Sequence, residues 1–411
     1  VGDTRQLSAV EAGNPFKSLQ KAGVETAYLN QSMRQKTQDL KFAVDKISDG
    51  QIAEGVKILD ENGRIKNSGD ERADQIASDY MSLTSEERKK TLILAGTNKD
   101  REEILDKIRN KLKEEGTLGK ETQSTKLKSK DLTTVQNKYA HHYLQGDVVM
   151  PLRDYKSLGL EKGQLYTVSQ IEGDQLKLST DNSTHTVDPA QFYKAVFEKK
   201  TINIAEGDRL KWTKNDAQLN RRNGQEFDVI QIEQDVATIE YDNGKKEEID
   251  LNKPHSLDHA LVSTTYSSQG KTANRVLVSA TSDKTLSKES FYVAASRAKF
   301  NLDIYSQDKK KLLEKAKQSQ AKQNPLEVLE NNLDIKSNAH KEIRNKVDRN
   351  VRNVFDKYVI KQMYDEHLKN QAKQTKQPTK DLVSTKSKQR SESIKSVSET
   401  EQQQKTRKLK R

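Results

Sequence analysis

The stretch Thr91–Lys113, TLILAGTNKDREEILDKIRNKLK, decides the fold class of this chain. It opens with a continuous apolar run that ends at Gly96, which is typical of a strand buried inside a parallel sheet. A helix is predicted to follow, from Asp100 to Lys113. A strand, a short loop and a helix in succession form a βα unit. The sequence therefore predicts an α/β fold.

The same α/β pattern occurs in two separate parts of the chain. Before Thr91, helices are predicted over residues 38–49, 53–59 and 70–81, and near the other end strands are predicted over 260–264, 275–280 and 301–305, with a helix over 289–298. Between the two parts, composition changes at Gly146, and short β runs alternate with turns as far as about residue 250. We therefore expect one α/β domain, residues 26–115 and 255–310, to close around tandem small β-barrels over 146–254. A linker and a helix, the latter over 133–143, are expected within 116–145.

Charge is concentrated at the end of the chain. The net charge of the 411 residues is +12, and residues 331–411 contain 21 Lys and Arg against 10 Asp and Glu. We predict charged helices over 311–370 and a disordered basic tail over 371–411, which either is simply solvated or binds phosphate backbones by releasing counterions. The chain has no Cys, which excludes disulfides and fits a reducing compartment. It has no apolar run of the length that a membrane span needs.

Five short segments carry candidate chemistry. They are GDTRQL at Gly2–Leu7, YLNQSMRQ at Tyr28–Gln35, ILAGTNKDR at Ile93–Arg101, TTYSSQGKT at Thr264–Thr272 and FYVAASRAK at Phe291–Lys299. Taken singly, each has a structural alternative: a Gly-Asp turn, a surface Arg, a helix cap made by Asn98 or Asp100, a polar loop, and a buried ion-paired Arg. Lys271-Thr272 lacks the upstream Gly of the phosphate loop G-x-x-x-x-G-K-[ST], and nothing else in the sequence matches that loop.

In this order the five segments resemble motif III, an arginine-containing motif, and motifs IV, V and VI of superfamily 1 helicases. With the segment Leu132–Val149, the segment Trp212–Asp216 and Asn223-Gly224, the chain is similar over about residues 1–310 to the helicase half of conjugative relaxases of the TrwC/TraI type, which are RecD-like motors. The resemblance implies RecA-like motor domains of the P-loop NTPase class. Residues 1–25 would end the first domain, and 26–115 with 255–310 would form the second, so the chain is expected to be the back part of a longer motor. Leu105-Asp106 departs from the family's usual Ile-Asn.

The resemblance also implies roles for individual residues. Arg297 would be the arginine finger, Arg34 would contact the γ-phosphate and Gln6 would relay the state of ATP. The other expected nucleotide contacts are Gly2, Asp3, Gln269, Gly270 and Lys271. Single-stranded DNA would contact Thr97, Asn98, Thr265, Ser267 and Ser268. The implied cofactors are ATP and Mg²⁺, with the metal ligands mainly outside this chain and no metal site within it.

The segment around Trp212 offers a second kind of DNA contact. A base could stack on this ring while Asn215, Asn223 and neighbouring basic residues follow the backbone. The alternative is that Trp212 belongs to the core of a β-barrel.

The resemblance implies an ATP-dependent DNA helicase, moving 5′→3′ along single-stranded DNA in plasmid transfer in the bacterial cytoplasm, with proteins of the conjugation machinery as further partners. Without a phosphate loop, the chain alone is expected not to hydrolyse ATP. Two alternatives stay open: a stand-alone RecD-like repair helicase, and a non-catalytic DNA-binding module supported by the β insertion and the basic tail.

Overall fold

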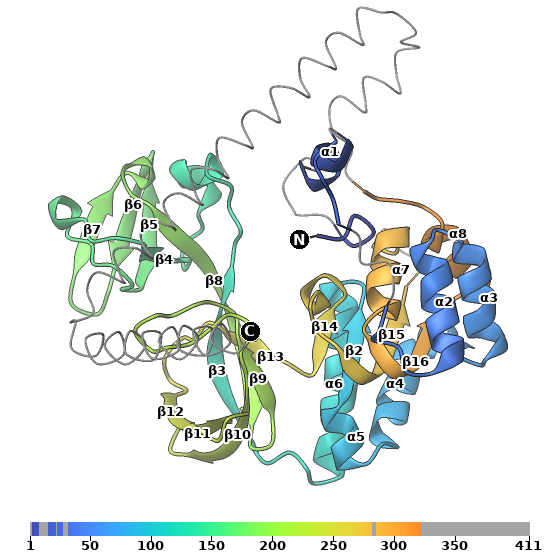
Figure 1. Ribbon diagram of the computed structural model, residues 1–411. Helices are drawn as coiled ribbons and strands as arrows, with labels where there is room; N and C mark the ends of the chain where they lie inside the picture. Colours follow the sequence, from blue (N-terminus) through green and yellow to red (C-terminus); the bar gives the residue numbers. More distant parts are fainter. Residues whose placement is uncertain (1, 8–14, 22, 28–31, 282–284, 322–411) are drawn as a thin grey trace, which may run out of the picture. The chain divides into compact units, whose positions relative to one another are not determined.

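The computed structural model describes residues 2–7, 15–21, 23–27, 32–281 and 285–321 (Figure 1). Contacts divide the chain into two units, one of residues 1–10 and 29–322 and one of residues 11–28 and 323–411. In the second unit the described part contains the helix α1 (Pro15–Lys21). The predicted tail over 371–411, and nearly all of the charged segment over 311–370, lie outside the described residues.

The first unit is built on a five-stranded parallel sheet. Its strands are β1 (Ile65–Asn67), β16 (Ala298–Ser306), β15 (Ala273–Ala280), β2 (Thr91–Ala95) and β14 (Val262–Thr264), in that spatial order. Every neighbouring pair is parallel, and β2 lies between β15 and β14. The expected α/β class is therefore confirmed.

Helices cover both faces of this sheet. Leu92 and Leu94 point into a core formed with α2 (Gln38–Ser48), α3 (Ile52–Glu61), α7 (Lys288–Ala295) and α8 (Lys309–Ala316). Ile93 and Ala95 point to the opposite face, where α4 (Arg72–Met81) and α6 (Asn98–Glu114) pack. Successive side chains of a strand face opposite ways, so an unbroken apolar run is what a strand between two cores requires.

The β insertion consists of two antiparallel sheets (Figure 1). In one, the order is β3 (Glu121–Ser129), β8 (Lys194–Ala205), β4 (Val148–Pro151), β5 (Tyr166–Glu172), β6 (Gln175–Ser179) and β7 (Thr184–Val187). In the other it is β12 (Lys246–Asp250), β11 (Val236–Tyr241), β10 (Glu226–Glu233), β9 (Arg209–Trp212) and β13 (Leu257–His259). The 12-residue β8 serves both, since its far end gives Ile202 and Ile204 to the core of the second sheet.

Several predicted elements need correction. The helix over 133–143 is wrong: the chain forms 3₁₀ turns at Gln136–Lys138 and Ala140–His142. Thr133 and Gln136 bond each other's backbone N–H groups with their side chains, as in a capping box that starts a helical turn, but the backbone of Tyr139 is extended and ends the turn. The expected linker holds strand β3, and α7 ends at Ala295, so that Ala298 already lies in β16. The structure also contains short elements that were not predicted, among them β1, β13 and the helix α5 (Ser85–Lys89).

Within the described residues, no helix combines the length and the apolar character needed to cross a lipid bilayer.

Candidate functional site

The segment 265–272 joins opposite ends of the parallel sheet. β14 ends at Thr264 and β15 begins at Ala273, and both strands run parallel to the intervening β2. The connection must therefore cross from the carboxyl end of the sheet to its amino end. Residues 97–98 follow β2 at the carboxyl end, whereas Arg297 directly precedes β16 at the amino end. The DNA contacts predicted at Thr97 and Asn98 thus lie at one end of the sheet, and Arg297 lies at the other.

Arg297 is held at the amino end by neutral acceptors. Its side chain is buried, at 1% exposed. Its Nε donates to the Val293 carbonyl at 3.0 Å, Nη1 to the Lys271 carbonyl at 3.2 Å and Nη2 to the Ser296 hydroxyl at 3.1 Å. No described carboxylate pairs with it, so the alternative of a buried ion pair is not what the structure contains. Burial, together with the nearby Arg34 charge, lowers the pKa of Arg297.

Arg34 lies beside Arg297. Its Nη1 donates to the Ser296 carbonyl at 2.7 Å. The next residue, Gln35, is buried and donates to the carbonyls of Ser296 and Ala298, and the Lys36 N–H donates to the Lys299 carbonyl at 2.7 Å. The segment 34–36 is therefore fixed along the start of β16, while residues 28–31 of the same motif lie outside the described residues.

Gln6 reaches the same region through Asp3. The Gln6 amide donates to Asp3 Oδ2 at 3.2 Å, and the Tyr292 hydroxyl, on α7, donates to the same oxygen at 3.3 Å. Partial burial of Asp3 opposes its ionisation, but hydrogen bonds from Arg5 and Gln6 outweigh burial and lower its pKa. Gln269 donates to the Leu7 carbonyl at 3.0 Å. The segment 2–7 therefore contacts both α7 and the 265–272 connection.

The glycines and Lys271 differ from the other predicted nucleotide contacts. Gly2 and Gly270 are exposed, and Gly270 has a φ of +86°, a left-handed conformation suited to glycine. Lys271 pairs through Nζ with Glu226 of β10 at 2.7 Å, so its ammonium group is directed to the β insertion. The structure thus does not place this ammonium group with Arg34 and Arg297; only the Lys271 carbonyl belongs to that cluster.

At the carboxyl end of the parallel sheet, some of the side chains predicted to contact DNA are exposed, and others point into the protein. Thr97 caps α6 by accepting from the Asp100 N–H at 3.1 Å, so the cap is neither Asn98 nor Asp100. Thr265 and Ser268 are buried and donate to the Ala95 and Thr265 carbonyls, because the 3₁₀ turn Tyr266–Ser268 folds them inward. Their predicted hydroxyl contacts with DNA are wrong for this conformation, whereas Asn98 and Ser267 are exposed.

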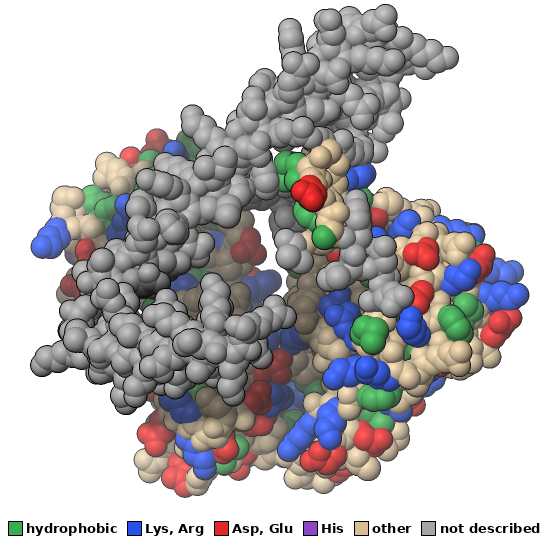
Figure 2. All heavy atoms as spheres, viewed as in Figure 1, with side chains coloured by type: hydrophobic (Ala, Val, Ile, Leu, Met, Phe, Trp, Pro, Cys, Tyr) green, Lys and Arg blue, Asp and Glu red, His purple; other side chains and the backbone are tan. Residues whose placement is uncertain are grey.

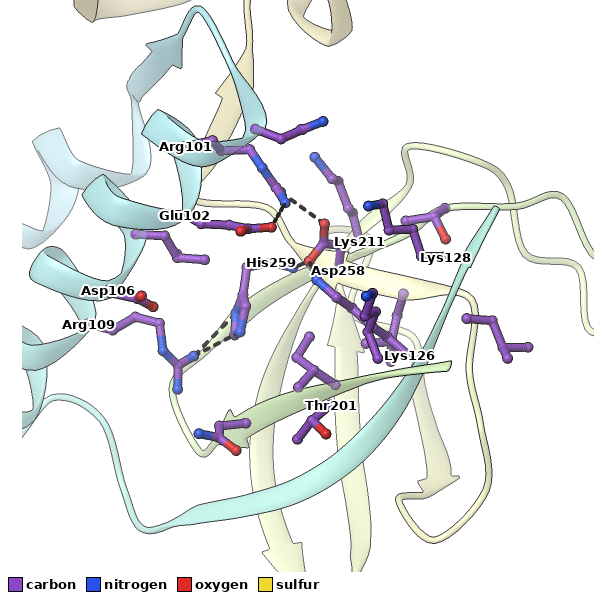
Figure 3. A pocket seen from close by; sticks show the side chains of 18 of the residues that line it. Arg101, Glu102, Asp106, Arg109, Lys126, Lys128, Thr201, Lys211, Asp258 and His259 are labelled. Atoms are coloured by element: carbon purple, nitrogen blue, oxygen red, sulfur yellow. Dashed lines mark hydrogen bonds and ion pairs between the residues drawn. The ribbon is translucent and has the colours of Figure 1, made fainter. Parts of the chain in front are cut away.

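Asn98 and Ser267 line a cleft of about 920 Å³. Figure 3 shows this cleft between α6, which carries Arg101 and Arg109, and the β insertion, which carries Lys126 and Lys211. Seven basic side chains and four acidic ones line it. The basic residues are Arg101, Arg109, Lys113, Lys126, Lys128, Lys200 and Lys211, and the acidic ones are Glu102, Asp106, Glu121 and Asp258. Sequence reasoning missed these residues as a group. The alternation Lys126-Leu127-Lys128 was a signal, because it places both lysines on one face of a strand.

Ion pairs inside the cleft tie α6 to the β insertion. Asp258 bonds Arg101 at 2.9 Å through one oxygen and Lys126 at 2.8 Å through the other. Deeper in, Arg109 bonds the buried Asp208 at 2.6 Å and Glu121 at 2.7 Å, and it donates to the His259 ring at 3.2 Å. Burial and the Arg109 charge lower the pKa of His259 to about 3, so the ring is neutral and can accept.

Trp212 is a core residue and not a stacking platform. It is 2% exposed, and its Nε1 donates to the Tyr241 hydroxyl at 3.0 Å. Phe227 packs with a ring-centre distance of 4.8 Å, and the Arg221 guanidinium lies 3.8 Å from the ring centre. The predicted base stacking is therefore wrong, and the core alternative is correct. Asn215 and Asn223 are exposed, and the Asn223 N–H donates to the Asn215 side chain at 2.8 Å within their own loop.

Comparisons with known proteins give two family matches and one curated relative. Residues 163–306 match the viral superfamily 1 RNA helicase core domain family, and residues 1–70 match an AAA domain family. The multifunctional conjugation protein TraI of Escherichia coli K12 is 22% identical over 366 residues, covering 75% of this chain and 20% of that protein. The chain thus spans about a fifth of the length of this curated relative.

Solved structures of Pif1 helicases are weakly similar. The enzyme from Bacteroides in complex with ADP-AlF3 and ssDNA shares 15% identity over 75% of this chain and 56% of that one, with a TM-score of 0.28. The enzyme from Candida albicans shares 14% sequence identity over 74% of this chain and 59% of that one, with a TM-score of 0.34. The helicase family match over residues 163–306 and the TraI match, taken with the order of the five segments, support a superfamily 1 helicase region of the TraI type on this parallel α/β core.

Proposed function

We propose that this chain is the second motor domain and DNA-binding insertion of an ATP-dependent DNA helicase that moves 5′→3′ along single-stranded DNA in plasmid transfer. The carrying observation is the convergence of Gln6, Arg34 and Arg297, which are far apart in sequence. Gln6 and Tyr292 both bond Asp3, Arg34 and Arg297 both bond Ser296, and the Ser296 N–H donates to the Tyr292 carbonyl within the same helix end. The similarity to TraI favours plasmid transfer over a repair role.

The charge of this cluster fits a triphosphate. Arg34 and Arg297 both approach Ser296, and among the described residues neither forms an ion pair. Two like charges whose hydrogen-bond acceptors are neutral form a positive site, which the nearby Asp3 carboxylate offsets only in part, and a planar guanidinium suits phosphate oxygens. Arg297 would exchange its bonds to the Lys271 carbonyl and the Ser296 hydroxyl for phosphate oxygens, where its charge would stabilise the charge that develops in phosphoryl transfer.

ATP would supply the free energy of phosphoryl transfer to water, with Mg²⁺ neutralising phosphate charge. The part of the chain that the structure describes has no group of three or more His, Cys, Asp or Glu side chains placed to hold a metal. The sequence also lacks a phosphate loop. We therefore expect the phosphate loop and the metal ligands on another polypeptide segment, with Arg34, Arg297 and Gln6 completing the site.

The position of the 265–272 connection supports a coupling between nucleotide binding at Arg297 and DNA binding at the cleft. Its Lys271 carbonyl accepts from Arg297 at one end of the sheet, and Ser267 lies at the cleft near the other end. A change in the bonds of Arg297 would move this connection. The exposed Asn98 and Ser267 are the side chains best placed to pass that movement to a bound strand.

The test uses the complete product of the gene that encodes this chain, with DNA-stimulated ATPase and strand unwinding as readouts. Arg297→Ala should lower the ATPase kcat by at least about 100-fold, while Lys57→Ala, the control at a side chain 73% exposed on α3, should leave it unchanged. The isolated 411-residue chain should bind single-stranded DNA without hydrolysing ATP. An ATPase of the isolated chain that vanished in Arg297→Ala would contradict the division of the site between two segments.

A further inference from the structure

One lysine in the cleft has no acidic partner. Lys211 lies on β9 directly opposite Asp258 of β13, and Figure 3 shows both side chains in the cleft. The two oxygens of Asp258 are already bonded to Arg101 and Lys126. Across the described residues, Lys211 forms no ion pair. Its ammonium group is therefore available to an anion that enters the cleft.

The acidic groups of the cleft leave positive charge uncompensated. Asp258 bonds two cations, and Glu121 likewise bonds Arg109 and Lys113. Lys128 shares a single carboxylate, Glu198, with Lys200, at 3.2 and 3.3 Å. On the face drawn in Figure 2, by contrast, basic and acidic side chains are interspersed. The cleft thus has more basic than acidic side chains in its lining.

The lining also indicates which part of a nucleic acid would fit. The aromatic rings in it, Phe197 and His259, are buried, so they offer no surface for stacking bases. The remaining polar groups include the side chains of Asn98, Thr201, Thr213 and Ser267. Ammonium, hydroxyl and amide donors along a groove match a chain of phosphates and sugars, which carries no base sequence.

We propose that this cleft holds the phosphate backbone of a single strand, with Lys211 and Lys128 as its phosphate contacts on the β insertion. The strand would continue from Asn98 and Ser267, which line the same cleft. This inference rests on the proposed function, since it extends the DNA path of the motor sheet onto the insertion. Binding there is independent of sequence and depends steeply on salt, because each phosphate contact releases counterions.

The experiment measures binding of a fluorescent oligothymidine of about 12 nucleotides to the 411-residue chain by anisotropy, over a series of salt concentrations. Lys211→Met should weaken binding about tenfold at low salt, the loss expected for one charge-assisted hydrogen bond. It should also reduce the slope of log K against log salt by about 0.7. Lys246→Met is the matched control, because Lys246 is 60% exposed on β12 of the same sheet and does not line the cleft.

A second variant guards against misfolding of Lys211→Met. Lys128 is exposed, so Lys128→Met should fold normally and still reduce the salt slope. Wild-type slopes in both variants, combined with weaker binding in Asn98→Ala, would overturn the inference and leave the proposed function standing. No binding of the oligonucleotide by the wild-type chain would instead overturn the proposed function. An equal loss of affinity for a polyglutamate peptide in Lys211→Met would show a general polyanion surface and would also overturn the inference.

Discussion

Arg34 and Arg297 share one residue as a hydrogen-bond acceptor: Arg34 bonds the Ser296 carbonyl at 2.7 Å, and Arg297 bonds the Ser296 hydroxyl at 3.1 Å. Two guanidinium groups are thereby held close together without a carboxylate between them. Like charges repel, and the Arg34 charge contributes to the lowered pKa of Arg297. A polyvalent anion bound between them would relieve this repulsion.

The first prediction concerns stability in the presence of such an anion. Inorganic tripolyphosphate, at constant ionic strength and about ten times its Kd, should stabilise the chain by about 1.4 kcal/mol. The expected rise in melting temperature is about 3–5 °C, measured by scanning fluorimetry. The rise should be absent in Arg297→Met and retained in Arg222→Met, whose side chain is exposed in a different part of the molecule. An equal rise in both variants would show that the anion binds elsewhere.

The second prediction concerns the buried ion pair between α6 and the β insertion. Asp208 is 4% exposed and receives two hydrogen bonds from Arg109, at 2.6 and 2.7 Å. Arg109→Met would leave this carboxylate buried without a cation, which should destabilise the fold by about 3–5 kcal/mol. Urea unfolding would measure the loss.

The control is Lys107→Met on the same helix. Lys107 pairs with Asp74 at the surface, and exposed pairs contribute less than about 1 kcal/mol. The double variant Arg109→Met/Asp208→Asn should recover part of the stability lost, because no buried charge would then lack a partner. A similar small effect of Arg109→Met and Lys107→Met would contradict the role assigned to the Arg109–Asp208 pair.

The third prediction concerns acid. Burial, with the charge of Arg109, depresses the pKa of His259 to about 3, below the ordinary value of 6.5. Between these two values the unfolded chain binds a proton that the folded chain does not, so stability falls as pH falls from about 6.5 towards 3. The Asp258 charge raises the pKa of His259, whereas the Lys126 and Arg101 charges lower it further.

The measurement is the free energy of unfolding in urea at pH 7, 6 and 5. His259 should contribute a slope of up to about 1.4 kcal/mol per pH unit below pH 6.5, and His259→Gln should remove that share. The neighbouring His255, whose pKa is also lowered chiefly by burial, should keep part of the dependence in the variant. An unchanged slope in His259→Gln would mean that the ring is protonated in the folded chain.

The sequence predicted elements whose pattern is strong and local. The apolar run at Thr91–Ala95 needs burial on both faces, and the helix after it has a regular apolar face, so both were identified to within a few residues. β3 was missed because only Ser124 and Leu127 of its nine residues are buried, which leaves no alternating pattern to detect. Where the pattern of apolar residues was strong, it was sufficient to predict the α/β fold class.

The candidate site was less predictable, because side-chain direction depends on tertiary contacts. Thr265 and Ser268 belong to a polar loop by sequence, yet the 3₁₀ turn directs both hydroxyls to backbone carbonyls. Lys271 follows a glycine as a phosphate-binding lysine would, yet Glu226 from the insertion bonds it. The cleft combines residues such as Arg101, Lys211 and Asp258, which only the folded arrangement of α6, β9 and β13 brings together.

The fourth prediction concerns the pH dependence of DNA binding. Burial, followed by the nearby Lys271 charge and opposed by Asp258, lowers the pKa of Lys211 to about 8. Arg101 lowers it further, and Glu226 raises it. A bound phosphate favours the ammonium form, so the affinity for oligothymidine should be constant below pH 8 and should fall above it, by up to about tenfold per pH unit.

The variant Lys211→Arg keeps its charge at every accessible pH, since the guanidinium does not deprotonate in proteins. This variant should bind with nearly constant affinity from pH 7 to about pH 9.5, whereas Lys246→Met should follow the wild type. Parallel curves for the wild type and Lys211→Arg would show that Lys211 does not contact the phosphate whose binding is measured.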